Sequence, residues 1–202
     1  MAIKADDRLI VALDFHTMED VKALVEKLGD SVSYYKVGME LFYSVGGEVV
    51  RWLRGQGKHV FLDLKLHDIP NTVAGGLCSL MDLGADILNV HASGGYTMMK
   101  TAADRLHAAA EERGIPCPKL IAITVLTSIN QEDWDGVGQT LPIKDAVVRP
   151  AGSAINDQSR IATPAKALTN GASHLVIGRP IRAAEDPKAA AEAILKEMET
   201  VK

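Results

Sequence analysis

The chain has 202 residues, of which 47% are apolar and 24% charged, with a formal net charge of −4 at pH 7 and a pI near 5.9. These values are typical of a globular protein with one substantial core, and we expect a single domain over residues 1–202. They argue against a basic surface for nucleic acid, and no apolar run is long enough to span a membrane.

Apolar, β-rich runs alternate along the chain with helical patterns. The runs expected to form strands are residues 9–15, 34–41, 60–66, 87–91, 120–126 and 175–177. Helical spacing of apolar residues follows Thr17, recurs before Gly55, Gly84 and Gly114, and follows the helix-starting pairs Thr163-Pro164 and Asp186-Pro187. Repeated strand–helix alternation predicts a parallel sheet covered by helices.

Residues 63–72, with the sequence DLKLHDIPNT, place charge on a segment that otherwise resembles a buried strand. Asp63 and Lys65 lie two positions apart, so in a regular strand they share a face, and Asp68 follows shortly after. A structural ion pair is the alternative interpretation. Because desolvation costs several kcal/mol per ion, and apolar replacements are often as stable, such dense charge more strongly indicates an active site.

Polar residues near the C-terminal ends of the expected strands favour a TIM-type βα barrel over a doubly wound sheet, because barrel enzymes gather their chemistry at that edge. These residues are Asp14, Lys36, Asp63, Lys65, His91, Thr127 and Arg179. In addition, no GxGxxG motif follows the first strand, which weakens a dinucleotide-binding interpretation.

Cysteine and histidine spacing indicates neither a disulfide framework nor a dedicated metal site. Cys78 and Cys117 lack CxxC spacing, and the six histidines include no HExxH motif. The N-terminal residues show no signal-peptide pattern. We therefore expect a cytoplasmic protein without a metal centre.

The sequence resembles the bacterial orotidine 5′-phosphate decarboxylases. The matching motifs are VALDF (11–15), YKVGMELF (35–42), VFLDLKLHDIPNT (60–72), NVHASGG (89–95), LTS (126–128) and VIGRPI (176–181), in the family's order. A DxKxxD motif alone is shared with a broader suite of barrel enzymes, but the DIPNT continuation is specific. The resemblance implies conversion of orotidine 5′-monophosphate (OMP) to uridine 5′-monophosphate (UMP) in pyrimidine biosynthesis, without metal or organic cofactor.

That reaction creates a carbanion at C6 of the pyrimidine, so the site must supply preorganised charge. Lys65 is the side chain of the motif that brings both a positive charge and a transferable proton, and we expect it to protonate C6 beside Asp63. The resemblance also implies that Lys36 joins this charge network and meets the ribose, and that Asp14 binds the ribose.

The resemblance implies further substrate contacts and a homodimer with shared active sites. Asp68, Ile69 and Thr72 are implied to reach the neighbouring subunit's site, and Thr127 to bond the pyrimidine edge. The residues implied to hold the phosphate are Gly178, Arg179, Arg149 and Gln158. For Gly178 and Arg179 this agrees with the usual place of phosphate in such barrels, near the last strands and a helix N-terminus.

The chain is shorter than the family pattern between residues 126–128 and 149–153, by about two βα units of an eight-unit barrel. Only six strands are expected, or seven if residues 146–148 are a remnant strand. The barrel is therefore expected to be incomplete. A real deletion, residues missing from the sequence, or completion by another chain would each explain the gap.

The residues alone leave two other functions open. One is a magnesium-dependent sugar-phosphate decarboxylase or hexulose-phosphate synthase of the same suite, although those relatives carry an acidic metal ligand where this chain has Lys36. The other is a catalytically inactive barrel that binds phosphorylated ligands or only assembles, for which the shortened segment is the sole support.

Overall fold

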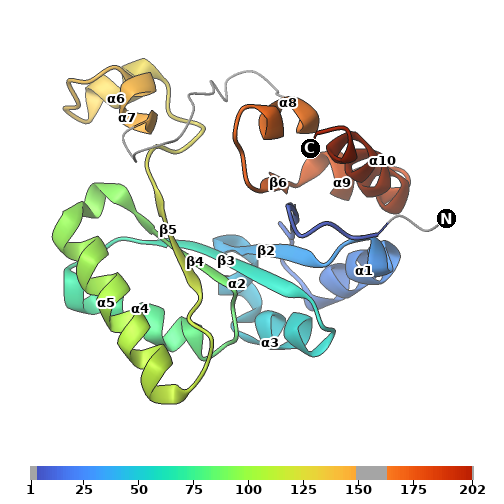
Figure 1. The fold of residues 1–202 in the computed structure, drawn as a ribbon, viewed down its shortest axis with the longest axis horizontal. Coiled ribbons are helices and arrows are strands. Elements are labelled where there is room, and N and C mark those ends of the chain that lie inside the picture. Colours follow the sequence, from blue (N-terminus) through green and yellow to red (C-terminus); the bar gives the residue numbers. More distant parts are fainter. Residues whose placement is uncertain (1–3, 149–162, 202) are drawn as a thin grey trace.

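The computed structural model describes residues 4–148 and 163–201. Six parallel strands form one sheet in the order β5-β4-β3-β2-β1-β6. The strands are β1 (Leu9–Ala12), β2 (Tyr34–Gly38), β3 (His59–Leu66), β4 (Ile87–His91), β5 (Lys119–Ile123) and β6 (Leu175–Ile177). The last strand pairs with the first, as in a barrel, but no strand of the described residues lies between β5 and β6 (Figure 1). The expected βα barrel is confirmed in an incomplete form.

Helices follow most of the strands. They are α1 (Met18–Leu28), α2 (Met39–Val45), α3 (Glu48–Gly55), α4 (Pro70–Met81), α5 (Gly95–Arg113), α6 (Gln131–Gly136), α7 (Ile143–Val148), α8 (Pro164–Thr169), α9 (Arg179–Arg182) and α10 (Pro187–Glu199). Short 3₁₀ turns occupy Gly29–Ser31 and Ala92–Gly94. Helices α4 and α5 pack side by side on the outer side of β3 and β4 (Figure 1).

Three helix starts predicted from the sequence are confirmed by their capping hydrogen bonds. The Thr17 hydroxyl oxygen accepts the Asp20 backbone N–H at 3.2 Å, and Thr163 and Asp186 cap α8 and α10 in the same way. Each cap pairs a backbone donor that the first helical turn leaves without a partner, which is worth about 1 kcal/mol.

The sheet has two different faces, as the period-2 alternation of a strand requires. Outward side chains form the main core with the helices, whereas Ile10, Tyr34, Phe61 and Ile87 form a separate apolar layer on the concave face. Toward the C-terminal ends of the strands the same concave face turns polar, because the residues two positions after Tyr34, Phe61 and Ile87 are Lys36, Asp63 and Asn89. The charged residues that the sequence predicted for the site therefore lie at the C-terminal end of the half-barrel.

Four strand assignments differ from the structure. The run 34–41 forms strand only to Gly38, because Leu41, Phe42 and Val45 follow helical spacing and pack against the core as part of α2. Residues 146–148 are not a remnant strand but the end of α7, whose first turn bonds back to the Pro142 carbonyl. The runs 9–15 and 120–126 also end earlier, as β1 and β5.

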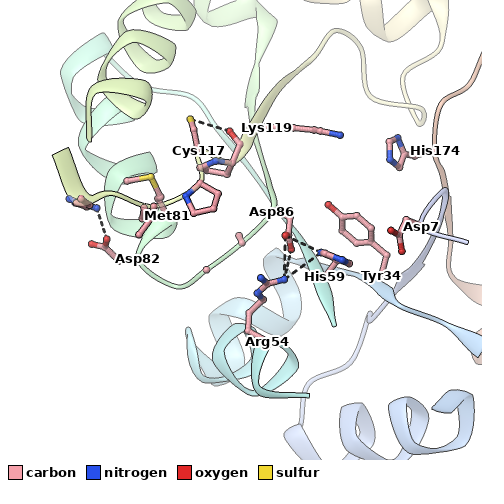
Figure 2. Close-up of a pocket in the computed structure, with 16 residues that line it drawn as sticks. Asp7, Tyr34, Arg54, His59, Met81, Asp82, Asp86, Cys117, Lys119 and His174 are labelled. Atoms are coloured by element: carbon pink, nitrogen blue, oxygen red, sulfur yellow. Dashed lines mark hydrogen bonds and ion pairs between the residues drawn. The ribbon is translucent and has the colours of Figure 1, made fainter. Parts of the chain in front are cut away.

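At the N-terminal ends of the strands, a cavity of about 740 Å³ is lined by charged and aromatic side chains (Figure 2). Asp86 is the centre of this cluster: it accepts the Val60 backbone N–H at 2.7 Å, an Arg54 N–H at 2.9 Å, and lies 3.0 Å from His59 Nδ1. These bonds tie β4 to β3 and α3. In barrel enzymes this end serves stability, so we place the chemistry at the opposite end.

No helix in the two described ranges is both long and apolar enough to cross a membrane.

Candidate active site

Four charged side chains meet at the C-terminal ends of β1, β2 and β3. The Lys36 ammonium lies 2.7 Å from Asp14 Oδ1 and 3.9 Å from Asp63 Oδ2. The Lys65 ammonium lies 2.6 Å from Asp63 Oδ1. Positive and negative groups therefore alternate in the order Asp14, Lys36, Asp63, Lys65, and the last three of these side chains are largely buried.

Lys65 reaches this array from an irregular backbone. Its φ of +51° lies in the left-handed region, the only such value at a non-glycine residue of the described chain. The pairing of β3 with β4 also shifts register between Leu62 and Leu66. The simple two-residue alternation is therefore interrupted at Lys65, yet the Lys65 ammonium still contacts Asp63.

Asn89 on β4 is a site residue that the sequence reasoning did not single out. Its Oδ1 accepts the Lys65 backbone N–H at 2.7 Å, and its Nδ2 donates to Asp63 Oδ1 at 2.7 Å. Apart from Ser31, it is the only buried polar residue of the described chain. The feature of the sequence that could have identified Asn89 is a single amide side chain at an inward-facing position of the otherwise apolar strand ILNVH.

His91 ends β4 beside this array, and its ring lies 5.7 Å from that of His67. Partial burial lowers the pKa of His91, and electrostatic interaction with the nearby His67 and Lys65 lowers it further. The imidazole is therefore held neutral near pH 7, where it adds no positive charge to the site.

The expected intersubunit residues lie at the start of α4, and no hydrogen bond or ion pair between described residues joins them to the charged array. Asp68, Ile69 and Thr72 are all exposed, and Asp68 accepts only the adjacent Ile69 backbone N–H among the described contacts. Thr127 lies in an exposed turn after β5, and no hydrogen bond between described residues joins it to the array.

Gly178 and Arg179 follow β6, next to the end of β1. A Cβ on Gly178 would lie 3.3 Å from Asp14 Oδ2, so the glycine permits close approach of this loop to the array. Arg179 is exposed and begins α9. Arg182, from the same helix, donates to the Asp14 backbone carbonyl and lies 5.2 Å from the Phe15 ring. Arg149 and Gln158 lie outside the described residues.

The chain is also similar in sequence to proteins of known family. A family model described as "Orotidine 5'-phosphate decarboxylase / HUMPS family" matches residues 7–147 and 137–194. The chain belongs to this family. The orotidine 5′-phosphate decarboxylase of Rhodopseudomonas palustris strain HaA2 is 43% identical, with 97% of this chain and 96% of the relative covered. That of Moorella thermoacetica is 42% identical, with 98% and 94% covered.

Solved structures agree with this family and its TIM-barrel fold. Orotidine 5′-phosphate decarboxylase from Lactobacillus acidophilus matches with a TM-score of 0.82 at 39% identity, covering 96% of this chain and 99% of that one. An uncharacterized conserved protein from Geobacillus kaustophilus matches with a TM-score of 0.83 at 34% identity, covering 94% and 99%.

The same comparisons locate the shortened segment. The two family matches meet and overlap at residues 137–147, where the sequence pattern lacks about two βα units. The alignments with the two relatives run over 235 and 238 positions, more than the 202 residues of this chain. Each relative therefore has residues without a counterpart here, in agreement with the open side between β5 and β6.

Proposed function

We propose a mechanism for the reaction that family membership assigns to this chain, the decarboxylation of OMP to UMP in pyrimidine biosynthesis. The observation that carries it is the array Asp14, Lys36, Asp63, Lys65 at the C-terminal end of the half-barrel. Two ammonium groups are held in place there by carboxylates before any substrate binds.

Lys65 is the proposed source of both charge stabilisation and the proton. Departure of carbon dioxide leaves the bonding electron pair on C6, and the Lys65 ammonium beside that carbon stabilises the pair and then transfers a proton to it. Asp63 accepts a hydrogen bond from the Lys65 ammonium at 2.6 Å, and this bond keeps the ammonium directed into the site. Lys36, largely buried between Asp14 and Asp63, lowers the electrostatic cost of placing two carboxylates near an anionic substrate.

Substrate contacts are proposed around this centre. Asp14 and Lys36 would hold the ribose, and Thr127 the pyrimidine edge. The phosphate would be held by Gly178, Arg179, Arg149 and Gln158. For Gly178 and Arg179 the support is their place after β6, where backbone N–H groups and a guanidinium can both reach an anion near Asp14.

A homodimer with shared sites is proposed from the exposed residues beside Lys65. Ile69 is 67% exposed and Tyr43 is 73% exposed, so both apolar side chains are open to contact with a second copy. Met39, Tyr43, His67 and His91 also line a hollow of about 660 Å³ that includes Lys65. Asp68, Ile69 and Thr72 of a second copy would enter each site from this side.

The two cysteines, Cys78 and Cys117, are free thiols. Free thiols are typical of a reducing compartment, and we propose that the protein is located in the cytoplasm.

The magnesium-dependent alternative meets a physical obstacle at Lys36. Its ammonium occupies the space between Asp14 and Asp63, so a divalent cation bound by those carboxylates would lie against a like charge. In the described ranges, no group of three or more His, Cys, Asp and Glu side chains is arranged to hold a metal ion.

The first experiment follows the loss of pyrimidine absorbance when the protein meets OMP in the presence of a chelator. We expect turnover, and a loss of at least about 1000-fold in kcat for Lys65→Ala, because one group supplies both charge and proton. Lys100→Ala, which removes an exposed α5 lysine paired with Asp104, is the matched control and should leave kcat unchanged. Turnover abolished by the chelator, or retained in Lys65→Ala, would contradict the mechanism.

The shared site is tested by mixing inactive variants. Lys65→Ala and Asp68→Ala should each lack activity alone. After subunit exchange in equal amounts, half of the dimers are mixed and each has one intact site, so about a quarter of the original activity should return. A mixture that stays inactive while light scattering reports a dimer would place Asp68 in its own subunit's site.

A further inference from the structure

We propose that Asn89 is a positioning residue that holds Lys65 and Asp63 in their working geometry, an inference that rests on the proposed function. Both ends of the Asn89 amide form hydrogen bonds with the array. The oxygen accepts from the Lys65 backbone N–H, and the nitrogen donates to the Asp63 carboxylate. It lies on β4, whereas both of its partners lie on β3.

Hydrogen-bond chemistry fixes the orientation of this amide. The Lys65 backbone N–H can only donate, so it requires the Asn89 carbonyl oxygen at 2.7 Å. The Asp63 carboxylate accepts a hydrogen bond from the Lys65 ammonium, and Asp63 Oδ1 also lies 2.7 Å from the Asn89 nitrogen. A flipped amide would lose both bonds and place two oxygens together. The side chain therefore has one favourable arrangement.

The hydrogen bond from the Lys65 N–H to Asn89 replaces a backbone hydrogen bond that the sheet lacks at this position. Where β3 shifts register against β4, the Lys65 N–H lies outside the regular ladder, and the residue adopts a φ of +51°. For a non-glycine residue this conformation is strained and persists only when its surroundings impose it. Asn89 supplies such a constraint, because its acceptor lies where the irregular N–H points.

The bond to Asp63 fixes the second catalytic partner. Asp63 Oδ1 receives the Lys65 ammonium and the Asn89 amide together, so rotation of the carboxylate would break both bonds. Asn89 is only 1% exposed and does not reach the space open to substrate. Its effect must therefore pass through Lys65 and Asp63, and it should alter kcat more than KM.

The test compares kcat and KM for OMP in Asn89→Leu, Asn89→Asp and Ser31→Ala. Leucine keeps the branched shape of asparagine but removes both hydrogen bonds, and misplacement of reacting groups by about 1 Å costs on the order of 100-fold. We expect about that loss in kcat for Asn89→Leu, with KM within about threefold of the parent value. Ser31, the other buried polar residue, bonds Glu192 far from the site, so Ser31→Ala should keep kcat.

Asn89→Asp separates the two bonds and covers the case in which Asn89→Leu does not fold. It keeps an acceptor for the Lys65 N–H but turns an oxygen toward Asp63, so kcat should still fall while the fold is retained. Native-state exchange of the Lys65 amide gives an independent readout: it should be slow in the parent and in Asn89→Asp, and fast in Asn89→Leu.

A kcat within threefold of the parent in both Asn89 variants would overturn the proposal, as would a loss confined to KM. An unprotected Lys65 amide in the parent protein would also overturn it. An inactive parent would instead contradict the proposed function, and amide exchange in the parent and in Asn89→Leu would then decide whether Asn89 holds Lys65.

Discussion

Asn89 and Ile121 are register partners across β4 and β5, yet Asn89 is 1% exposed and Ile121 is 38% exposed. Both side chains lie on the concave face of the sheet. The difference arises because β4 has neighbours on both sides, while β5 is an edge of the described sheet. The concave face of the sheet is therefore buried at β4 and exposed to solvent at the neighbouring strand β5.

A charge placed on this opened face should be tolerated. Ile121→Lys should lower the melting temperature by only a few degrees, because the new ammonium reaches water. Ile87→Lys is the matched variant on the same face of β4, where Ile87 is 5% exposed, and it should unfold the protein because burying an unpaired charge costs several kcal/mol. Thermal melts of both variants provide the test. Equal destabilisation would show that another chain covers β5 in solution.

Tyr35 offers a stabilising substitution. Its side chain is fully buried on the outer face of β2, and its hydroxyl has no hydrogen-bond partner among the described residues. Burial also raises the pKa of this phenol well above its usual value near 10. Tyr35→Phe removes an unsatisfied polar atom, so we expect the free energy of unfolding to rise by about 1 kcal/mol. Urea denaturation measures this change, and a loss of more than 1 kcal/mol would reveal a partner for the hydroxyl.

Acidification should destabilise the protein through His91 and His174. Burial lowers the pKa of both imidazoles below the ordinary value near 6.5, with further lowering from nearby positive charges. As the pH falls through 6.5, the unfolded chain gains protons that the folded chain does not, so the free energy of unfolding falls until the folded histidines protonate too. Urea unfolding between pH 7.5 and 5 should show this slope.

The double variant His91→Gln with His174→Gln should flatten that slope, whereas His107→Gln on the exposed face of α5 should leave it unchanged. An unaltered slope in the double variant would assign the acid sensitivity to other groups.

The sequence predicted the six strands and the contact between Asp63 and Lys65 well, because both depend on local patterns. Alternating apolar runs specify strands, and Asp63 and Lys65 belong to one short motif. It did not predict the role of Asn89, because that role depends on a register shift between β3 and β4 that no local pattern encodes. The remnant strand at 146–148 was wrong for a related reason: a three-residue apolar run fits either state, and Pro142 starts a helix.

Lys36 provides the sharpest test of how the array works. Its ammonium balances two carboxylates, so Lys36→Met removes one positive charge from a site that must accept an anionic substrate. We expect kcat/KM to fall by at least about 100-fold, as for loss of a preorganised charged group. Lys58→Met is the matched control, because the Lys58 ammonium is also half-buried but bonds the Gly29 and Val32 carbonyls away from the site. That variant should lose stability and keep kcat/KM, and a comparable loss of activity in both would mean that Lys36 acts only by supporting the fold.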